Sequence, residues 1–600
     1  MKREENLTST TALQNNESVN PTFGPSMYGS EVFINSSFHP LTYSIPTVVD
    51  VETDEKDNFV GLAVCQDARD IFYFTNLELV KKLLERCPLI GHNVKFDLKL
   101  LKKWGLNIKP EQLHFDTCLA SYVVNTTKES HHLKDLGKEI LGMTWPTYRE
   151  MVGSGRKKQT LDKQEVGRVS AYCGMDCLAT FKLYQYFMRI MNPTQRHLLN
   201  HVELPISRIL MEMELNGITI DTDYLMKLNL EFSGKMLDIE AELNKQWYSI
   251  GKEEKLNPNS NRQIAELLEA QGAVLPMTQK GNKKVDKGTL EQWKQLPSVA
   301  LLLEYNKLEK LVSTYTTGLL EKQQNGKIYA SFNQITKNEK GYESGISTGR
   351  LSSSAPNLQN IPVRSKEGGL IRRAFIPSDG KVFIDADYSQ IEYRLLAHFS
   401  KEPRLIQAFM EEKDVHEETG RLLGCSRDVG KTLNFASIYG AQATKIAKTA
   451  KVSEQEAEKF LGTYWKVLPR VTAWINRVKF EARAKKGIFT LLRRWIPLPG
   501  ISSQNRFERM HWERAAVNYC IQGSAAELMK LALIKLKESG YVPVLTCHDE
   551  FLIEITNNGL GLETSHVNLI KNIMESVVKL DVPLIADIGI GDNWASAKGD

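Results

Sequence analysis

Residues 381–398 read KVFIDADYSQIEYRLLAH, and this stretch decides the fold of the chain. Its apolar first half predicts a buried strand that ends near Asp387. A helix is expected to follow from about Gln390. The junction therefore places an acidic side chain at the end of a strand, where the sheet holds it rigidly.

A second acidic segment follows about 160 residues later, where residues 543–555 read PVLTCHDEFLIEI. The pattern predicts two strands joined by a tight turn that carries His548, Asp549 and Glu550. Alone, this turn fits an ordinary polar loop equally well. An acid at a strand end beside an acid at a hairpin tip, however, makes a platform for two divalent metal ions.

Between these segments, residues 426–442 read SRDVGKTLNFASIYGAQ. Arg427, Lys431, Phe435 and Tyr439 recur every four residues, so on a helix they form one slowly turning stripe. Two cations followed by two aromatics suit a nucleoside triphosphate, with phosphates on the cations and the base against the rings. An amphipathic helix with aromatics in the core and cations in water fits the same spacing.

A separate acidic set begins at the strand predicted for residues 47–53, TVVDVET, whose hairpin partner is residues 59–65. Asp50 and Glu52 lie two apart, so both point to one face. Each acid alone fits a solvated surface charge. That alternative is weaker for Asp50, because an unpaired charge in an apolar strand is costly to bury.

The set continues in GHNVKFDLKLL, residues 91–101, where Asn93 and Asp97 are four apart on a predicted helix. Tyr172 and Asp176 have the same spacing further on. Four carboxylates delivered by one strand and two helices can hold two divalent cations that activate water and clamp a phosphate. Tyr172 is placed to orient that water.

Bulk properties indicate a globular protein of several domains. The chain has 600 residues, 42% hydrophobic and 25% charged, with a net charge of +5 and eight scattered cysteines. Reduced, buried thiols and an intracellular location are expected. We see no signal peptide and no apolar run that would cross a membrane. Residues 1 to about 45 are rich in Ser, Thr, Asn and Pro and predict an irregular or disordered lead.

The ordered pattern DxE, NxxxD and YxxxD resembles the DnaQ-like proofreading 3′→5′ exonuclease domain. The resemblance covers roughly residues 46–190 and includes FDTCLASYVV and HHLKDLGKEILG. It implies hydrolysis of a mispaired primer 3′ end that arrives as a single strand. The metal ligands that it implies are Asp50, Glu52, Asp97 and Asp176.

The segments around Asp387, Lys431 and Asp549 resemble, in this order, motifs A, B and C of the family A DNA polymerases. Further segments agree: ELPISRILMEMELNGITID, STGRLSSSAPNLQNIP, ERAAVNYCIQGSAAELMK and VPLIADIGIGDNW. The implied fold is an α/β exonuclease domain with a mixed, RNase H-like sheet, followed by an α+β right-hand polymerase with an antiparallel palm sheet and helical thumb and fingers. The expected divisions are lead 1–45, exonuclease 46–195 and polymerase 196–600, with thumb about 222–325, palm about 330–410 and 500–600, and fingers about 411–499.

The resemblance also implies roles for individual residues. Asp387 and Asp549, with the Tyr388 carbonyl, would bind two Mg²⁺ ions, as the exonuclease acids would, and Mn²⁺ could substitute. Glu392 would exclude a ribose 2′-hydroxyl, Lys431 would donate a proton to pyrophosphate, and Glu550 would be a supporting acid. The dNTP would contact Tyr388, Gln390, Glu392, Arg427, Lys431, Phe435 and Tyr439. Primer–template DNA would contact Arg350, Asn357, Gln359, Arg514, Asn518, Gln522 and His548.

Departures from the family pattern concern Tyr393, where leucine is usual, the pair Thr546-Cys547, and the segment LLRRWIPLP at residues 491–499. The stretch from His416 to Arg427 is short compared with bacterial members of the family and is closer in length to phage members. About 45 residues precede the first exonuclease strand, too few for a 5′-nuclease domain. Both favour a phage-like replicative enzyme in the cytoplasm of a bacterial host. Its expected partners are helicase, primase, single-strand binding protein or a processivity factor.

Basic residues gather in the expected thumb at Lys280, Lys283, Lys284 and Lys287. They would grip the DNA backbone, although a solvated loop explains them nearly as well. Two rival functions remain: a single-subunit RNA polymerase, against which Glu392 and the exonuclease argue, and a catalytically silent DNA-binding protein, which would be expected to lose some of the metal carboxylates.

Overall fold

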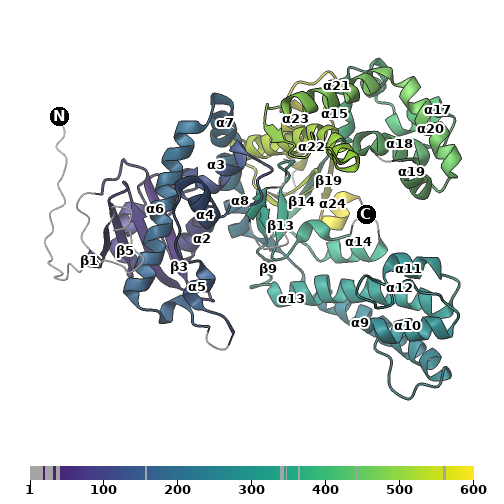
Figure 1. The fold of residues 1–600 in the computed structure, drawn as a ribbon, viewed down its shortest axis with the longest axis horizontal. Coiled ribbons are helices and arrows are strands. Elements are labelled where there is room, and N and C mark those ends of the chain that lie inside the picture. The colour runs from purple at the N-terminus through teal and green to yellow at the C-terminus, as the bar shows by residue number, and fades with distance from the viewer. Residues whose placement is uncertain are drawn as a thin grey trace.

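An α/β unit at the N-terminus leads into a larger unit that surrounds a second sheet (Figure 1). The computed structural model describes residues 18–19, 31–35, 41–155, 158–337, 343–345, 347–362, 365–440, 442–557 and 562–599. Among them, no helix is both long enough and apolar enough to span a bilayer. Within the same part of the chain, the cysteines are free thiols and almost all are buried, as predicted.

The N-terminal sheet is built around β3 (Thr47–Thr53) and β4 (Phe59–Cys65), the predicted hairpin, which pair antiparallel. β3 also runs parallel to β6 (Leu89–Gly91), so the sheet is mixed, as expected. Its order is β1-β2-β5-β4-β3-β6-β7. The other strands are β1 (Ser18–Val19), β2 (Glu31–Ile34), β5 (Asp70–Phe74) and β7 (Leu113–Asp116).

Helices cover this sheet. The longest, α6 (Val166–Ile190), packs on β3 and β4 through a buried apolar face. It ends at Ile190, and Met191 and Asn192 are extended ahead of Pro193, since proline disfavours helix in the residue before it. The others are α1 (Lys81–Leu84), α2 (Lys95–Lys103), α3 (Thr117–Val124), α4 (Leu133–Leu136), α5 (Tyr148–Val152) and α7 (Pro193–Leu198).

The expectation of an irregular lead is wrong for Glu31–Ile34. This segment forms β2 and pairs in parallel with β5, with Val32 buried. The short apolar run VFI completes the sheet although polar residues surround it. Strand pairing depends on a distant partner, so local composition concealed it. Residues 1–17, 20–30 and 36–40 of the lead lie outside the described residues.

The second sheet has the order β17-β18-β14-β19 and is antiparallel throughout. The strand β14 (Lys381–Tyr388) is central, flanked by β18 (Glu550–Thr556) and β19 (Ala586–Gly591), with β17 (Pro543–Cys547) at the edge. In this register Asp387 lies opposite Glu550. The antiparallel palm sheet predicted from sequence is therefore confirmed.

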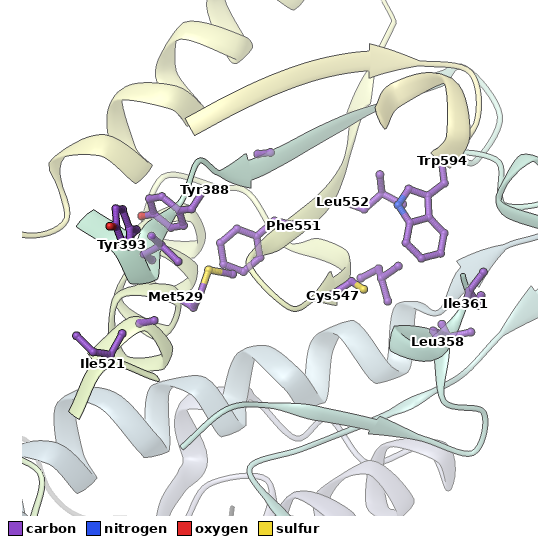
Figure 2. Packing of buried hydrophobic residues seen from close by; sticks show 14 of the residues in the cluster. Leu358, Ile361, Tyr388, Tyr393, Ile521, Met529, Cys547, Phe551, Leu552 and Trp594 are labelled. Atoms are coloured by element: carbon purple, nitrogen blue, oxygen red, sulfur yellow. The ribbon is translucent and has the colours of Figure 1, made fainter. Parts of the chain in front are cut away.

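Aromatic and aliphatic side chains pack between this sheet and α22 (Arg506–Glu538), as Figure 2 shows. Tyr388, Phe551 and Met529 are buried there, and Trp594 closes the far end. Burying each large apolar side chain contributes about 1.5–3 kcal/mol. The end of the sheet that carries the acids therefore rests on a close-packed base.

Helices form two arms around the palm (Figure 1). One arm holds α9 (Thr222–Ser249), α10 (Asn261–Ala270), α11 (Lys287–Gln292), α12 (Pro297–Lys310) and α13 (Gly318–Lys322). The other holds α16 (Pro403–Met410), α17 (Val415–Leu423), α18 (Arg427–Tyr439), α19 (Ala443–Ala450), α20 (Glu454–Val467) and α21 (Pro469–Lys485). Within the first arm, α10 carries the amphipathic sequence NRQIAELLEA, whose apolar face packs in the core.

Shorter elements complete the larger unit. Its remaining helices are α8 (Leu204–Asn216), α14 (Lys366–Arg373), α15 (Ile391–Ser400), α23 (Leu562–Ser576) and α24 (Trp594–Lys598). Its short strands are β8 (Ile218–Thr219), β9 (Lys327–Ile328), β10 (Ser331–Asn333), β11 (Ile335–Lys337), β12 (Glu343–Gly345), β13 (Ser352–Ser354), β15 (Gly487–Phe489) and β16 (Trp495–Pro497).

Buried charges join the two units. Glu214 on α8 receives ion pairs from Lys95 and Lys99 on α2. Because Asp97 lies between these lysines on the same helix, the pairs tie one of the predicted exonuclease acids to the larger unit. Breaking a buried pair leaves an uncompensated charge, so such contacts hold a defined geometry.

Candidate active sites

The two predicted palm acids meet at one end of the second sheet. Asp387 lies near the end of β14, and Asp549 lies in the turn between β17 and β18. The Tyr388 backbone N–H donates to the Asp549 carbonyl oxygen at 3.1 Å. His548 has a φ of 56°, the left-handed conformation that makes this turn tight. Both carboxylates border one cavity of about 520 Å³.

Residues from separate segments share this cavity. Those predicted from sequence are Arg350, Asp387, Tyr388, Gln390, Glu392, Lys431, Phe435, His548 and Asp549. Tyr393, His416 and Asn434 also line it. His416 was not among the predicted site residues, and its single position in the sequence carried no pattern that marked it. Burial lowers the pKa of His416 to about 4, so its ring is neutral near pH 7.

The cation–aromatic stripe is confirmed as a helix, and α18 begins at Arg427 behind the cap Ser426. Lys431 and Phe435 border the cavity, and Phe435 is 43% exposed. An exposed ring argues against the alternative in which the aromatics fill the core. Arg427 instead pairs with Asp414 at 2.7 Å. The side chain of Tyr439 lies outside the described residues.

Electrostatic conditions at the acids favour a cation. Burial raises the pKa of Asp549 to about 6, and Asp387 adds to this by repulsion. Burial likewise raises the pKa of Asp387. Clustered carboxylates that repel one another and offer oxygen atoms fit a hard divalent ion such as Mg²⁺. Glu392 is paired with Arg350, which holds it at the cavity wall.

The acids predicted for the exonuclease site also converge. Asp50 and Glu52 lie on one face of β3, and the Val51 N–H donates to Asp97 Oδ1 at 3.1 Å. Asp176 on α6 accepts from Trp145 Nε1 at 2.6 Å and pairs with Lys134. Burial, reinforced by Asp176, raises the pKa of Asp50 to about 8.

The other two acids are in the same environment. Burial followed by repulsion from Asp50 raises the pKa of both Glu52 and Asp97. These acids lie close enough for their negative charges to repel one another, and a bound cation would relieve that repulsion. The donor set therefore fits divalent metal ions here too.

The expectation that Asn93 shares a helix face with Asp97 is wrong. The helix α2 begins at Lys95, and Asn93 precedes it with a φ of 58°. The Asn93 and Val94 N–H groups donate to the Asp116 carboxylate at 3.1 and 3.0 Å, which holds the chain in a turn there. A distant acceptor thus overrides the helical spacing.

Two parts of the chain match models of known protein families. Residues 222–596 match the model for DNA polymerase family A, and residues 38–192 match the model for a 3′–5′ exonuclease. The chain belongs to DNA polymerase family A. The sequence resemblance is therefore confirmed at the level of the family.

Similar proteins are known from several bacteria. The chain is 32% identical to DNA polymerase I of Pseudomonas aeruginosa over 87% of its length, and 32% identical to that of Synechocystis over 92%. It covers 58% and 60% of those proteins, so it spans less than two thirds of their length. A solved structure described as the POL domain of Pol1 from M. smegmatis in complex with DNA primer-template and dNTP superposes with a TM-score of 0.76 at 29% identity, covering 92% of this chain and 96% of that one.

Of the residues predicted to contact DNA, only Arg350 and His548 line the cavity that Asp387 and Asp549 border, within the part of the chain that the structure describes. Arg514, Asn518 and Gln522 follow one another every four residues along α22, and Asn518 Nδ2 donates to Gln522 Oε1 at 3.4 Å. Gln359 Nε2 donates to the Thr546 carbonyl at 3.1 Å, beside the acidic turn. Asn357 borders a separate cavity of about 450 Å³ between the two units.

Sequence reasoning missed several neighbours of the predicted metal-binding acids. In the exonuclease site, Cys173 lies 3.3 Å from Asp50 Oδ2, and the Lys134 ammonium lies 4.2 Å above the Tyr172 ring. In the polymerase site, Asp385 and Lys598 adjoin Asp387. The alternation in IDAD could have revealed Asp385, since residues two apart on a strand share a face.

Proposed function

We propose that this chain is a DNA-directed DNA polymerase that also proofreads by 3′→5′ exonucleolytic hydrolysis. One observation carries the proposal: Asp387 and Asp549, far apart in sequence, border one cavity together with Lys431 and Phe435. Metal-binding acids, a phosphate-binding cation and an exposed ring are what a nucleotidyl transfer site needs.

In the polymerase site, Asp387, Asp549 and the Tyr388 carbonyl would hold two Mg²⁺ ions. When bound, these ions activate the primer 3′-hydroxyl and neutralise the triphosphate and leaving pyrophosphate. Lys431 projects from α18 into the cavity, where its ammonium meets the phosphates and can supply a proton to pyrophosphate. Phosphoryl transfer depends mainly on such positioning and charge neutralisation.

The side chains that line the cavity would select the nucleotide. Glu392 is buried and held by Arg350, and its side chain would fill the space beside the sugar. Phe435 offers an exposed ring face to the base. Arg427 would exchange Asp414 for the triphosphate, which binds a guanidinium with several oxygens. Tyr439 completes the predicted dNTP contacts.

In the exonuclease site, Asp50, Glu52, Asp97 and Asp176 would hold two divalent ions. When bound, such ions activate a water and stabilise the leaving 3′ oxygen. Tyr172 lies one helical turn before Asp176 on α6, so its hydroxyl can orient the attacking water. Lys134, which pairs with Asp176, would supply a positive charge near the scissile phosphate.

The finer assignments are part of this proposal. We assign the thumb to about 222–325, the fingers to about 411–499, and the palm to the segments on either side of the fingers. Primer–template DNA and dNTPs are the proposed substrates. Three further points stay predictions. They are a phage-like replicative role, an intracellular location, and contacts with helicase, primase, single-strand binding protein or a processivity factor.

Primer extension tests the proposal. Purified protein is given matched and mismatched primers, with and without Mg²⁺, and with deoxy- and ribonucleotides side by side. We expect Mg²⁺-dependent extension with dNTPs and removal of the mismatched end. Preference for ribonucleotides would favour the RNA polymerase alternative, and no extension at all would favour the silent DNA-binding alternative.

Two variants separate the sites. Asp387→Asn should abolish extension and leave 3′-end trimming intact. Asp50→Ala combined with Glu52→Ala should do the reverse. If either variant lost both activities while remaining folded, the assignment of two independent sites would be wrong.

A further inference from the structure

The C-terminal helix α24 lies flat against the palm strand β19. Two glycines make this approach possible: a methyl group at Gly589 would lie 1.9 Å from the Ala597 carbonyl oxygen, and one at Gly591 would lie 2.3 Å from the Ala597 nitrogen. These distances are far inside van der Waals contact. Glycine at both positions therefore lets the backbone of α24 lie against the sheet that carries the acids.

This placement brings Lys598 to the polymerase acids. Its ammonium lies 2.8 Å from Asp387 Oδ2, 2.8 Å from Glu550 Oε2 and 3.4 Å from Asp385 Oδ1. The Lys598 side chain is 19% exposed, and those of Asp385 and Glu550 are 3% and 8% exposed. The ammonium of Lys598 thus contacts three acids, and two of them, Asp385 and Glu550, are also hydrogen-bonded to each other.

The other oxygen of Glu550 is held by the same helix. Trp594 Nε1 donates to Glu550 Oε1 at 2.6 Å. Arg372 lies 3.9 Å above the Trp594 ring and 3.9 Å from the same carboxylate oxygen. Both oxygens of Glu550 therefore have partners on α24, and the carboxylate is held beside Asp387 without being free to turn.

We propose that Lys598 is a positioning residue of the polymerase site. It holds the Glu550 carboxylate away from the metal ions and orients the Asp387 carboxylate toward them. The inference rests on the proposed function. Partners of ligating carboxylates fix their orientation, and losing one usually costs about 10- to 100-fold in metal affinity or activity. Here we expect the cost in activity, because the ammonium that is lost also competes with the metal ions for Asp387. Without the ammonium, Glu550 would turn toward the ions as an extra ligand and distort their geometry.

The test replaces Lys598 with methionine, which keeps the apolar stem and removes the charge. The background carries Asp50→Ala and Glu52→Ala, so that Mn²⁺ detected by electron paramagnetic resonance reports on the polymerase site. We expect Mn²⁺ to bind about fivefold more tightly, because a competing positive charge is gone. The kcat for extension should fall about 10- to 100-fold with the KM for dNTP nearly unchanged.

Matched variants separate positioning from folding. Lys598→Arg should recover most of the kcat, and Lys535→Met, on the exposed face of α22, should match the parent. Adding Glu550→Gln to Lys598→Met should raise kcat again by about threefold or more, because the freed carboxylate is then absent. Exonuclease activity in the wild-type background reports folding of each protein.

Unchanged Mn²⁺ affinity in Lys598→Met would overturn the inference, as would a kcat within about twofold of the parent, well short of the expected loss. If Lys598→Met does not fold, Lys598→Arg decides, since loss of activity there despite a retained charge would also contradict the inference. A parent protein that fails to extend primers counts against the proposed function instead, and the Mn²⁺ titration still reports on Lys598.

Discussion

Replacing Glu203 with glutamine should destabilise the protein by about 3–5 kcal/mol, the usual cost of breaking a buried ion pair. Glu203 is fully buried. It accepts from Lys530 at 2.7 Å and from Arg494 at 2.6 Å. Neutralising it leaves one excess positive charge in a buried cluster, with Glu527 as the remaining acid partner of Arg494.

The pKa of Glu203 reflects the same ion pairs and leads to a similar energy. Burial alone raises this pKa, but Lys530 and Arg494 outweigh burial and bring it down to about 2 from 4.5. A shift of that size corresponds to about 3 kcal/mol, since each pKa unit is worth about 1.4 kcal/mol. Because the folded pKa is lowered, this stability is present above pH 4.5 and is lost as the pH falls toward 2.

Urea unfolding at pH 7 and at a series of lower pH values provides the assay. The free energy of unfolding of the wild-type protein should fall on acidification as the contribution of Glu203 is lost. Glu203→Gln should have a lower free energy of unfolding at pH 7, and that free energy should change less with pH below 4.5. Glu231→Gln is a suitable control, because its partner Lys235 forms an exposed pair on α9. If Glu203→Gln lowered the free energy of unfolding at pH 7 by less than about 1 kcal/mol, the range of surface ion pairs, the buried pairs would not contribute the stability assigned to them.

Three further predictions concern the polymerase site. Phe435→Tyr should reduce discrimination against dideoxynucleotides by about tenfold, since the new hydroxyl can replace one missing hydrogen bond; unchanged incorporation ratios would place Phe435 away from the sugar. Glu392→Ala should raise kcat/KM for ribonucleotides relative to dNTPs by about tenfold or more in single-nucleotide extension, and an unchanged ratio would contradict its role at the 2′ position. Gly591→Ala should displace α24 and cut extension by about tenfold while sparing 3′-end trimming; equal loss of both activities would indicate general unfolding instead.

Local patterns were sufficient for the elements that carry the acids. The apolar run before Asp387 and the turn after Cys547 predicted β14, β17 and β18, and the four-residue spacing from Arg427 predicted α18. Strand and helix periodicity are local properties, so they survive without knowledge of distant partners. The convergence of Asp387 with Asp549 followed because both acids sit at the same end of neighbouring strands.

Contacts between distant segments could not be predicted in this way. Asn93 left the expected helix because Asp116 accepts its N–H, and Val32 joined the sheet because β5 offered a free edge. Both outcomes depend on partners more than 20 residues away, which no local window includes.

The sequence by itself therefore determined the family and the elements on which the candidate acids stand, because short-range periodicity sets where a side chain points. The two acidic sites stay predictions. Only the tertiary structure decided which groups surround those acids. Lys598 reaches Asp387 and Glu550 because two glycines let the final helix lie on the sheet. Charge compensation of buried acids acts through space, and the chain brings its cations to them from wherever the packing allows.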